Sequence, residues 1–391
     1  MLPSRMPRAI LIVLDSVGIG HAHDAAAFGD EGSNTIGHIA EAFPDWRLSF
    51  LEKCGLNEAR AIASGTKHDK NAPREMAYGC LNEVSSGKDT TTGHWEIAGA
   101  PMDEPFATFE SFPPELVVEM EVASGVTFIG NVAESGTVIL EKLGEEHVRT
   151  GNPILYTSAD SVIQIAAHES LIPLERLYEI CIACRKIADR ERIGRVIARP
   201  FLGESAASFQ RTTNRKDFSM IPPRMILDAL NDTGIPVIGI GKISDIFAGK
   251  GISISHSTKS NAAGMAAIEA TYADAAHEAL IFANLVDFDS LYGHRRDPEG
   301  YANCLSEFDS WFADFLPKLA PEDLLMITAD HGNDPTWRGT DHTREKVPLL
   351  VKGGETKGDS VGERETFADI AASLADFFEM EDWTTGQSFL G

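Results

Sequence analysis

Acidic and histidine side chains of a kind that bind metals gather in two short stretches of the sequence. In the stretch DFDSLYGH, His294 follows Asp289 by five residues. In the stretch ADHGNDPTWRGTDH, Asp330 and His331 are adjacent, and His342 follows eleven residues later. Mixed carboxylate and imidazole ligands suit Zn²⁺, Mn²⁺ or Fe²⁺ better than Ca²⁺ or Mg²⁺, which prefer oxygen ligands alone. These residues therefore indicate a site for divalent metal ions.

Each of these residues also has an ordinary structural explanation. An aspartate at the end of a strand often caps the following helix, and a single histidine lies more often on the surface or in a satisfied core than on a metal. The combination favours the metal site, because an Asp-His pair after an apolar run is followed by a glycine and then by a second histidine. With Asp15, which follows another apolar run, the set reaches six members, enough for two cations.

Three apolar runs that end in an acid are expected to position the carboxylates. Their sequences are RAILIVLDSVGIG, ALIFANLVDFDS and DLLMITADHGND, and the acids are Asp15, Asp289 and Asp330. Continuous runs rich in β-branched residues are typical of buried parallel strands, and helical patterns alternate with them. This alternation predicts an α/β fold with a mainly parallel sheet flanked by helices. Because sites in such sheets lie beyond the carboxyl ends of the strands, we expect the three carboxylates at one edge.

The middle of the chain has a different pattern, which predicts a second domain. Residues 101–221 contain turn clusters and a shorter mixed pattern, without strands that end in acids. We expect a discontinuous metal-binding catalytic core of residues 1–100 and 222–391, with residues 101–221 as an inserted smaller α/β cap domain for the substrate. A chain of 391 residues exceeds the size at which a single hydrophobic core usually stops growing, so two domains are the expected outcome.

Composition excludes several classes of protein. The formal net charge of -25 disfavours a nucleic acid partner, which needs a broad basic face, but local cations or bound metal ions would still hold a small phosphorylated substrate. No stretch approaches the roughly 18 apolar residues of a membrane span, so we expect a cytoplasmic protein without a membrane partner. The five cysteines do not suit a disulfide framework, and Cys181 and Cys184 fit the packing of a helix better than a redox motif.

The stretch SSGKDTTTGHWE, residues 85–96, offers hydroxyl groups that could react. Three threonines follow Asp89, and Gly87 and Gly93 allow a tight turn. Two cations about 3.5–4 Å apart clamp the oxygens of a phosphoryl displacement, and a hydroxyl that bridges them is activated as a nucleophile. The commoner explanation for such a threonine is a helix cap or a turn, and only the predicted metal set favours the catalytic role.

Six segments of the chain resemble the phosphopentomutase family, which belongs to the alkaline phosphatase superfamily. They are VLDSVGIG, SSGKDTTTGHWEIAG, PILYTSADSVIQIAAHE, GIGKISDIF, LVDFDSLYGHRRD and TADHGNDPTWRGTDHTRE, and they are spread over essentially the whole chain. The resemblance implies an alkaline phosphatase-like core. It also implies a phosphomutase that interconverts ribose 1-phosphate, or its 2-deoxy analogue, and the 5-phosphate through a phosphothreonine enzyme and a bound 1,5-bisphosphate.

The resemblance further implies roles for individual residues at the metal centre. Thr90, rather than Thr92, takes the position of the phosphorylated nucleophile and would reach both metal ions. The metal of this family is Mn²⁺, and two ions per chain are implied. The ligands of one ion would be Asp15, Asp330 and His331, and those of the other would be Asp289, His294 and His342.

Four substrate contacts and an activator also follow from the resemblance. Ser158 and Asp160 correspond to residues that contact the pentose, and Arg199 and Lys242 correspond to cations for its distal phosphate. Without the resemblance, both cations are as readily explained as solvated surface charges. A sugar bisphosphate such as glucose 1,6-bisphosphate would prime the enzyme, and no obligate protein partner is predicted.

Two alternative functions remain open from the sequence. A phosphohydrolase or phosphodiesterase of the same superfamily would share the metals and the nucleophile but would have no need to exclude water, so the product distinguishes it. A metal-binding protein without catalysis would use the acids and histidines as structural ligands. Structural metal sites are usually closed, so a reactive hydroxyl at the site would count against that alternative.

Overall fold

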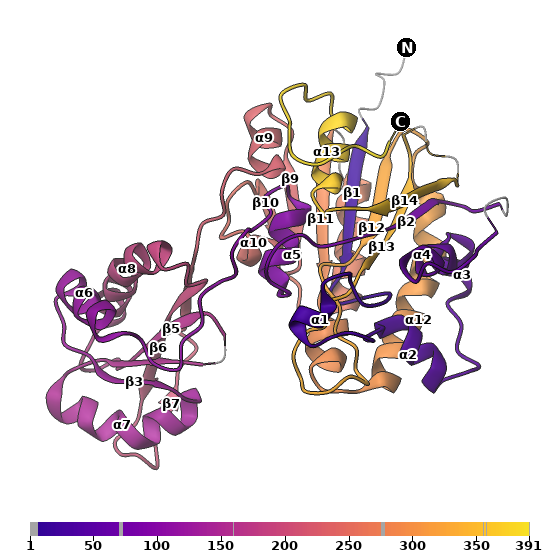
Figure 1. The fold of residues 1–391 in the computed structure, drawn as a ribbon. Helices are drawn as coiled ribbons and strands as arrows, with labels where there is room; N and C mark the ends of the chain where they lie inside the picture. Colours follow the sequence, from indigo (N-terminus) through magenta and orange to yellow (C-terminus); the bar gives the residue numbers. More distant parts are fainter. Residues whose placement is uncertain are drawn as a thin grey trace. The chain divides into compact units, whose positions relative to one another are not determined.

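The computed structural model describes residues 7–69, 73–158, 160–274, 278–354, 356 and 358–390. The chain divides into two compact units (Figure 1). The first, which we call the core unit, comprises Met1–Glu104 and Pro222–Gly391, and the second, which we call the insertion, comprises Pro105–Ile221. Each unit has its own sheet and its own helices.

An eight-stranded sheet lies at the centre of the core unit, in the order β10-β9-β11-β1-β12-β13-β2-β14 (Figure 1). The strands are β1 (Arg8–Leu14), β2 (Ala77–Leu81), β9 (Val237–Ile240), β10 (Ile254–His256), β11 (Ala279–Leu285), β12 (Leu324–Thr328), β13 (Val347–Lys352) and β14 (Ser360–Arg364). Among the described strands of this sheet, β13 alone pairs antiparallel with its neighbours. The predicted α/β fold with a mainly parallel sheet is confirmed.

Helices cover both faces of the core sheet (Figure 1). In one layer, α5 (Thr90–Ile97) contacts α10 (Ile243–Ile246) and α13 (Asp369–Phe377). Helix α13 also contacts α9 (Ile226–Asp232). In another layer, α12 (Pro298–Phe315) contacts α2 (Thr35–Ala42) and α3 (Ser49–Lys53). Helix α3 also contacts α4 (Leu56–Ala63). The remaining helices of the unit are α1 (Ala25–Phe28), α11 (Asn261–Asp274), the π-helix η1 (Phe288–Gly293) and the 3₁₀-helix η2 (Leu316–Lys318).

The three central strands explain the apolar runs of the sequence. Every residue of β1, β11 and β12 is buried, as expected for parallel strands covered on both faces. The register pairs Leu14 of β1 with Leu285 of β11, and Val13 with Thr328 of β12. The three strands therefore end level with one another, and the residues that follow them emerge at the same edge of the sheet.

The insertion contains a second, smaller mixed sheet. Its strands are β3 (Ile129–Ala133), β4 (Ile154–Thr157), β5 (Val162–His168), β6 (Arg195–Leu202), β7 (Gln210–Arg211) and β8 (Lys216–Ser219), in the order β3-β4-β5-β6-β7, with β8 also paired to β6. Its helices are α6 (Pro114–Ser124), α7 (Gly136–Thr150) and α8 (Leu174–Arg190). Cys181 and Cys184 lie in the buried apolar cluster between α8 and this sheet, in keeping with a packing role.

Across the described residues, no helix combines the length and the apolar character needed to cross a membrane.

Candidate metal centre

The acids of the metal set follow three adjacent parallel strands. Asp15 comes directly after β1, Asp330 comes two residues after β12, and Asp289 lies in η1 just beyond β11. Because β1 lies between β11 and β12 in the sheet, the three carboxylates meet at one edge, where ligands bind in open α/β sheets. The structure thus brings together carboxylates that are more than 300 residues apart in the chain, as Asp15 and Asp330 are.

One group of potential ligands consists of Asp15, Asp330 and His331, all of them buried. The Nε2 atom of His331 lies 3.6 Å from Oδ1 of Asp15 and 3.4 Å from Oδ2 of Asp330. Neither of these carboxylate oxygens has a hydrogen-bond partner in the part of the chain that the structure describes. Buried charged oxygens without partners are costly, so their presence fits a cation held between them.

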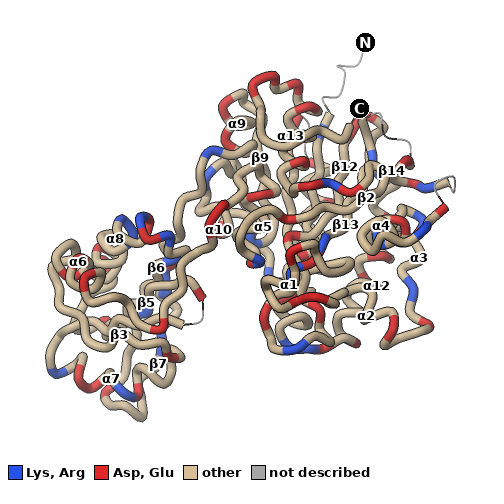
Figure 2. Tube along the Cα trace, viewed as in Figure 1, with Lys and Arg blue, Asp and Glu red and all other residues tan. Residues whose placement is uncertain are grey.

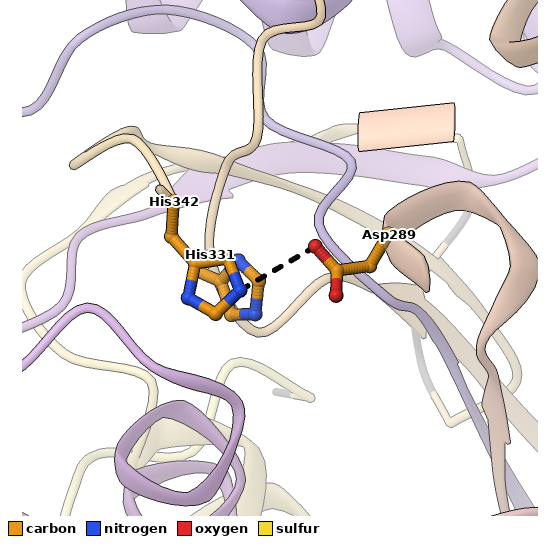
Figure 3. A group of neighbouring side chains, drawn as sticks. All are labelled: Asp289, His331 and His342. Carbon is orange, nitrogen blue, oxygen red and sulfur yellow. Dashed lines mark ion pairs between the residues drawn. The ribbon is translucent and has the colours of Figure 1, made fainter. Parts of the chain in front are cut away.

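The second group is built around Asp289. Its Oδ1 atom lies 3.4 Å from Nε2 of His342, and its Oδ2 atom lies 3.2 Å from Nε2 of His294. The Nε2 atoms of these two histidines are 3.2 Å apart. His331 also belongs to this group, and its ring stacks on that of His342 with centroids 3.9 Å apart (Figure 3). His331 therefore lies between the two groups, whereas the sequence resemblance assigned it to the first alone.

Backbone carbonyls orient all three histidines in the same way. Each Nδ1 atom lies within hydrogen-bond distance of a carbonyl oxygen: His294 with Thr340 at 2.7 Å, His331 with Gly332 at 3.0 Å and His342 with Lys88 at 3.0 Å. A carbonyl oxygen only accepts, so the proton resides on Nδ1 and the Nε2 side of each ring faces the carboxylates. Such outer contacts are typical of metal-binding histidines, because they select the tautomer and the ring orientation.

The carboxylates are held by similar outer contacts. Oδ2 of Asp15 accepts a hydrogen bond of 3.1 Å from Asn284, and Oδ1 of Asp330 accepts one of 3.0 Å from the backbone N–H of Ser16. In both residues the other oxygen is left for the centre of the site. Oδ1 of Asp289 accepts a hydrogen bond of 2.7 Å from Asn333. The donor set, its unpartnered oxygens and its fixed tautomers all fit divalent metal ions.

Charge at the site is unbalanced without a cation. Burial raises the pKa of Asp15, and the negative charges of Asp330 and Asp289 raise it further. Burial also opposes ionisation of Asp289, but hydrogen bonds from His294 and His342 outweigh burial and lower its pKa. The hydrogen bond between His294 and Asp289 raises the pKa of His294 to about 9. In the metal-free protein, a proton on this imidazole therefore partly neutralises the acids.

Thr90 is the threonine whose hydroxyl reaches this cluster. It is the first residue of α5, and its Oγ1 lies 3.2 Å from Nε2 of His331. Asp89 caps the helix by accepting hydrogen bonds from the backbone N–H groups of Thr91 and Thr92. The hydroxyl of Thr92 also donates to Asp89, at 2.5 Å, so it serves the cap. This geometry favours Thr90 over Thr92 as the reactive residue.

A glycine allows α5 to approach the site. A Cβ atom at Gly93 would lie 2.1 Å from the carbonyl oxygen of Asp330, far inside contact distance. The helix that begins at Thr90 therefore packs directly against the segment that carries Asp330 and His331.

The four expected substrate residues are divided between the units. Lys242 lies in the core unit just after β9, and its positive charge lowers the pKa of Asp15. Ser158, Asp160 and Arg199 lie in the insertion. The guanidinium of Arg199, on β6, donates a hydrogen bond of 2.9 Å to Gln164 on β5, and Asp160 is exposed, 3.8 Å from Arg195.

Two arginines near Arg199 were not singled out from the sequence. Burial lowers the pKa of Arg199, and the positive charges of Arg215 and Arg211 lower it further. The hydroxyl of Tyr156 beside them is buried and has no hydrogen-bond partner in the described residues. Figure 2 shows Lys and Arg positions along β6. The clustering of basic residues in ARPF and RTTNRK was the available sequence signal, but only the pairing of the strands places them together.

Comparisons with known proteins identify the family of the chain. The family model of the Metalloenzyme superfamily matches residues 7–382. The phosphopentomutase of Syntrophotalea carbinolica is 50% identical over 387 residues, which cover 98% of this chain and 97% of that one. The phosphopentomutase of Carboxydothermus hydrogenoformans is 51% identical over 391 residues, which cover 99% of each chain.

The chain belongs to the phosphopentomutase family. The resemblance seen in the sequence is thereby confirmed, and the chain is a phosphomutase, an isomerase of the Metalloenzyme superfamily. Membership of that superfamily indicates that it binds divalent metal. A solved structure, the PH0037 protein from Pyrococcus horikoshii, matches 97% of this chain and 99% of its own with a TM-score of 0.51. At 14% identity, that similarity supports the fold alone.

Proposed function

We propose that this phosphomutase interconverts ribose 1-phosphate, or 2-deoxyribose 1-phosphate, and the corresponding 5-phosphate. Support comes from the sequence identity of 50% and 51% with two enzymes named phosphopentomutase, over nearly the full length of each pair of chains. The observation that carries the mechanism is the 3.2 Å distance between the Thr90 hydroxyl and Nε2 of His331, the residue shared by both ligand groups.

In this proposal Thr90 carries the phosphoryl group between two sugar oxygens. The phosphothreonine gives its phosphoryl to the 5-hydroxyl of the 1-phosphate: the bond from Oγ1 to phosphorus breaks, the bond from O5 to phosphorus forms, and the hydroxyl proton ends on Oγ1. The bound 1,5-bisphosphate then returns the phosphoryl from O1 to Thr90, with the proton moving the opposite way. The product is the 5-phosphate, and the phosphothreonine is regenerated.

The residues that would hold two Mn²⁺ ions are Asp15, Asp330 and His331 on one side and Asp289, His294 and His342 on the other. When bound, such ions neutralise charge on the transferring phosphoryl group and lower the pKa of the attacking hydroxyl. Asn284, Ser16 and Asn333 orient the carboxylates.

Substrate recognition is assigned to residues of both units. Ser158 and Asp160 would contact the pentose, and Arg199 and Lys242 would bind the distal phosphate. The basic surroundings of Arg199 and the unpartnered hydroxyl of Tyr156 support an anion at that end of the insertion. The role of the insertion as a cap that excludes water, the need for a sugar bisphosphate activator and the cytoplasmic location stay predictions.

The phosphothreonine can be tested by peptide mapping. Protein loaded with Mn²⁺ is treated with glucose 1,6-bisphosphate, digested and analysed by mass spectrometry. We expect one phosphoryl group per chain, located on Thr90 and removed by an excess of ribose 1-phosphate. A phosphoryl group on Thr91 or Thr92, or none at all, would contradict the assignment.

A further inference from the structure

A buried histidine lies between the nucleophile and a metal ligand without belonging to either ligand group. His94 is on α5, four residues after Thr90, and its side chain is fully buried. Its Nδ1 atom lies 2.9 Å from the carbonyl oxygen of Thr90 and 3.1 Å from Oδ2 of Asp330. Oδ2 is also the oxygen that faces His331. His94 therefore contacts the two groups whose relative position decides how the hydroxyl meets the metal centre.

The contacts of His94 determine where its proton resides. Carbonyl and carboxylate oxygens only accept, so the nitrogen that faces them, Nδ1, must carry the hydrogen. The hydrogen bond goes to the carbonyl of Thr90, while Oδ2 of Asp330 lies beside the N–H without the alignment of a hydrogen bond. Nε2 has no hydrogen-bond partner within the described ranges, and the ring packs on Phe282 and Phe247. The Nδ1–H of His94 therefore attracts Oδ2 of Asp330 electrostatically, while the lone pairs of Oδ2 stay available to a metal ion.

The other oxygen of Asp330 is held from the opposite side. Ser16 donates its backbone N–H to Oδ1 at 3.0 Å, and it does so in a left-handed conformation with φ of 73°. This conformation is unfavourable for a residue with a side chain and persists only where its surroundings impose it. Here Tyr301 donates its hydroxyl to the carbonyl of Ser16 at 2.9 Å. Asp330 is thus held by a hydrogen bond from Ser16 at Oδ1, and its Oδ2 lies beside the N–H of His94.

We propose that His94 is a positioning residue whose Nδ1–H sets the spacing between Thr90 and Asp330. This spacing aligns the Thr90 hydroxyl with the ligand group of Asp15, Asp330 and His331. This inference rests on the proposed metal centre and on Thr90 as nucleophile. A histidine that served only to fill the core would also need an acceptor for its buried N–H, as His147 has. What distinguishes His94 is that the same Nδ1 lies 3.1 Å from Oδ2 of the metal ligand Asp330.

Three substitutions separate the N–H from the bulk of the ring. In His94→Asn the amide nitrogen takes the place of Nδ1, in His94→Gln it takes the place of Nε2, and His94→Leu has no donor. His147→Gln serves as a matched control, because His147 is another fully buried histidine whose Nδ1 contacts a carbonyl, that of Asn152 at 2.6 Å, but it lies in the insertion.

The readouts are Mn²⁺ binding, measured by titration calorimetry and by electron paramagnetic resonance, and the extent of Thr90 phosphorylation. Removal of an outer contact to a metal ligand typically weakens metal binding by about 10 to 100-fold. We expect that loss for one of two ions in His94→Gln and His94→Leu, together with slower phosphorylation. His94→Asn should bind both ions within a few fold of the unsubstituted protein, and His147→Gln should leave metal binding unchanged.

Each outcome either supports the proposal or overturns it. Equal metal binding and phosphorylation in all three His94 variants would assign the ring to packing alone. An equal loss in His94→Asn and His94→Leu would show that the ring matters rather than its N–H. Unfolding of all three variants, seen by circular dichroism, would also assign the ring to packing. If the unsubstituted protein does not bind two ions, the proposed metal centre itself fails, which is a separate result.

Discussion

At the scale of single residues, the structure distinguishes Thr90 from Thr92, which in the sequence only the family resemblance could do. Three consecutive threonines follow Asp89, yet their hydroxyls have different surroundings. The hydroxyl of Thr92 is bound by the capping aspartate, whereas that of Thr90 faces His331. A hydroxyl that is bound to the capping carboxylate is less free to attack phosphorus, so the local structure of the helix start supports the proposal of Thr90 as the nucleophile.

Thr90→Ala tests this assignment. The variant should form no phosphoenzyme, and its mutase kcat should fall by at least about a thousandfold, because the covalent step has no acceptor. Mn²⁺ binding should persist, since none of the carboxylate and imidazole ligands is changed. Thr91→Ala is the matched control, since no side-chain hydrogen bond of Thr91 is found in the described contacts, and it should retain activity. Substantial turnover by Thr90→Ala would exclude Thr90 as the nucleophile.

His294 predicts how metal binding depends on pH. Its hydrogen bond with Asp289 raises its pKa to about 9, so in the metal-free protein this imidazole is protonated at neutral pH. A metal ion requires the free Nε2 lone pair, so binding must displace that proton. The apparent affinity for Mn²⁺ should therefore rise by about tenfold per pH unit below about pH 9 and level off above it.

Titration calorimetry measures this linkage. At pH 7, in two buffers of different ionisation enthalpy, the binding heats should differ by an amount that corresponds to about one proton released per chain. Identical heats in both buffers would mean that no group loses a proton, which would contradict the protonated state of His294.

At the scale of elements, the loop before α5 depends on one buried guanidinium. Arg344 pairs with Glu83 at 2.6 Å and also donates to the carbonyl of Gly87 at 2.6 Å, three residues before Thr90. The side chains of Arg344 and Glu83 are both about 1% exposed. Lys88, next in the loop, pairs with Asp30 at 2.9 Å. The loop that precedes Thr90 is thus held by buried or partly buried ion pairs.

Arg344→Met should destabilise the protein strongly. It leaves the carboxylate of Glu83 buried without its partner, and breaking a buried pair in this way costs about 3–5 kcal/mol. Arg224→Met is the control, because Arg224 pairs with Asp232 at the surface and its loss should change the free energy of unfolding by less than about 1 kcal/mol. Urea unfolding measures both values. A loss below about 1 kcal/mol for Arg344→Met would show that the buried pair does not support the loop.

Part of the site could be predicted from the sequence for a clear reason. Apolar runs that end in acids identify Asp15, Asp289 and Asp330 as residues beyond strand ends, and parallel strands bring such ends to one edge. The order β11-β1-β12, which makes the three acids neighbours, is a tertiary property and could not be derived from the runs themselves. For the same reason the sequence did not show that His331 lies between both ligand groups.

The buried polar contacts of His94 and Arg344 were harder to predict from the sequence. His94 and Arg344 are charged or polar types whose partners lie far away in the chain, and nothing in their immediate sequence shows that they are buried. From the sequence alone, the histidine inside GHWE is best explained by packing, and no catalytic step can be assigned to it. The distances from His94 to Thr90 and Asp330 are the observations that support a positioning role.

At the scale of the whole molecule, an acidic chain acts on a phosphorylated substrate. The formal net charge of -25 repels anions, so binding requires local positive charge. The metal centre in the core unit and the arginines around Arg199 in the insertion are two such places. Each of these places offers positive charge that could hold a phosphate group.

The measurement that tests this account most directly is ³¹P NMR of the Mn²⁺-loaded protein with ribose 1-phosphate and a trace of glucose 1,6-bisphosphate. We predict that the signal of ribose 5-phosphate grows while inorganic phosphate stays low, and that no conversion occurs without the bisphosphate. Accumulation of inorganic phosphate in place of ribose 5-phosphate would mean that water takes the phosphoryl group, and it would contradict the mutase mechanism proposed for this site.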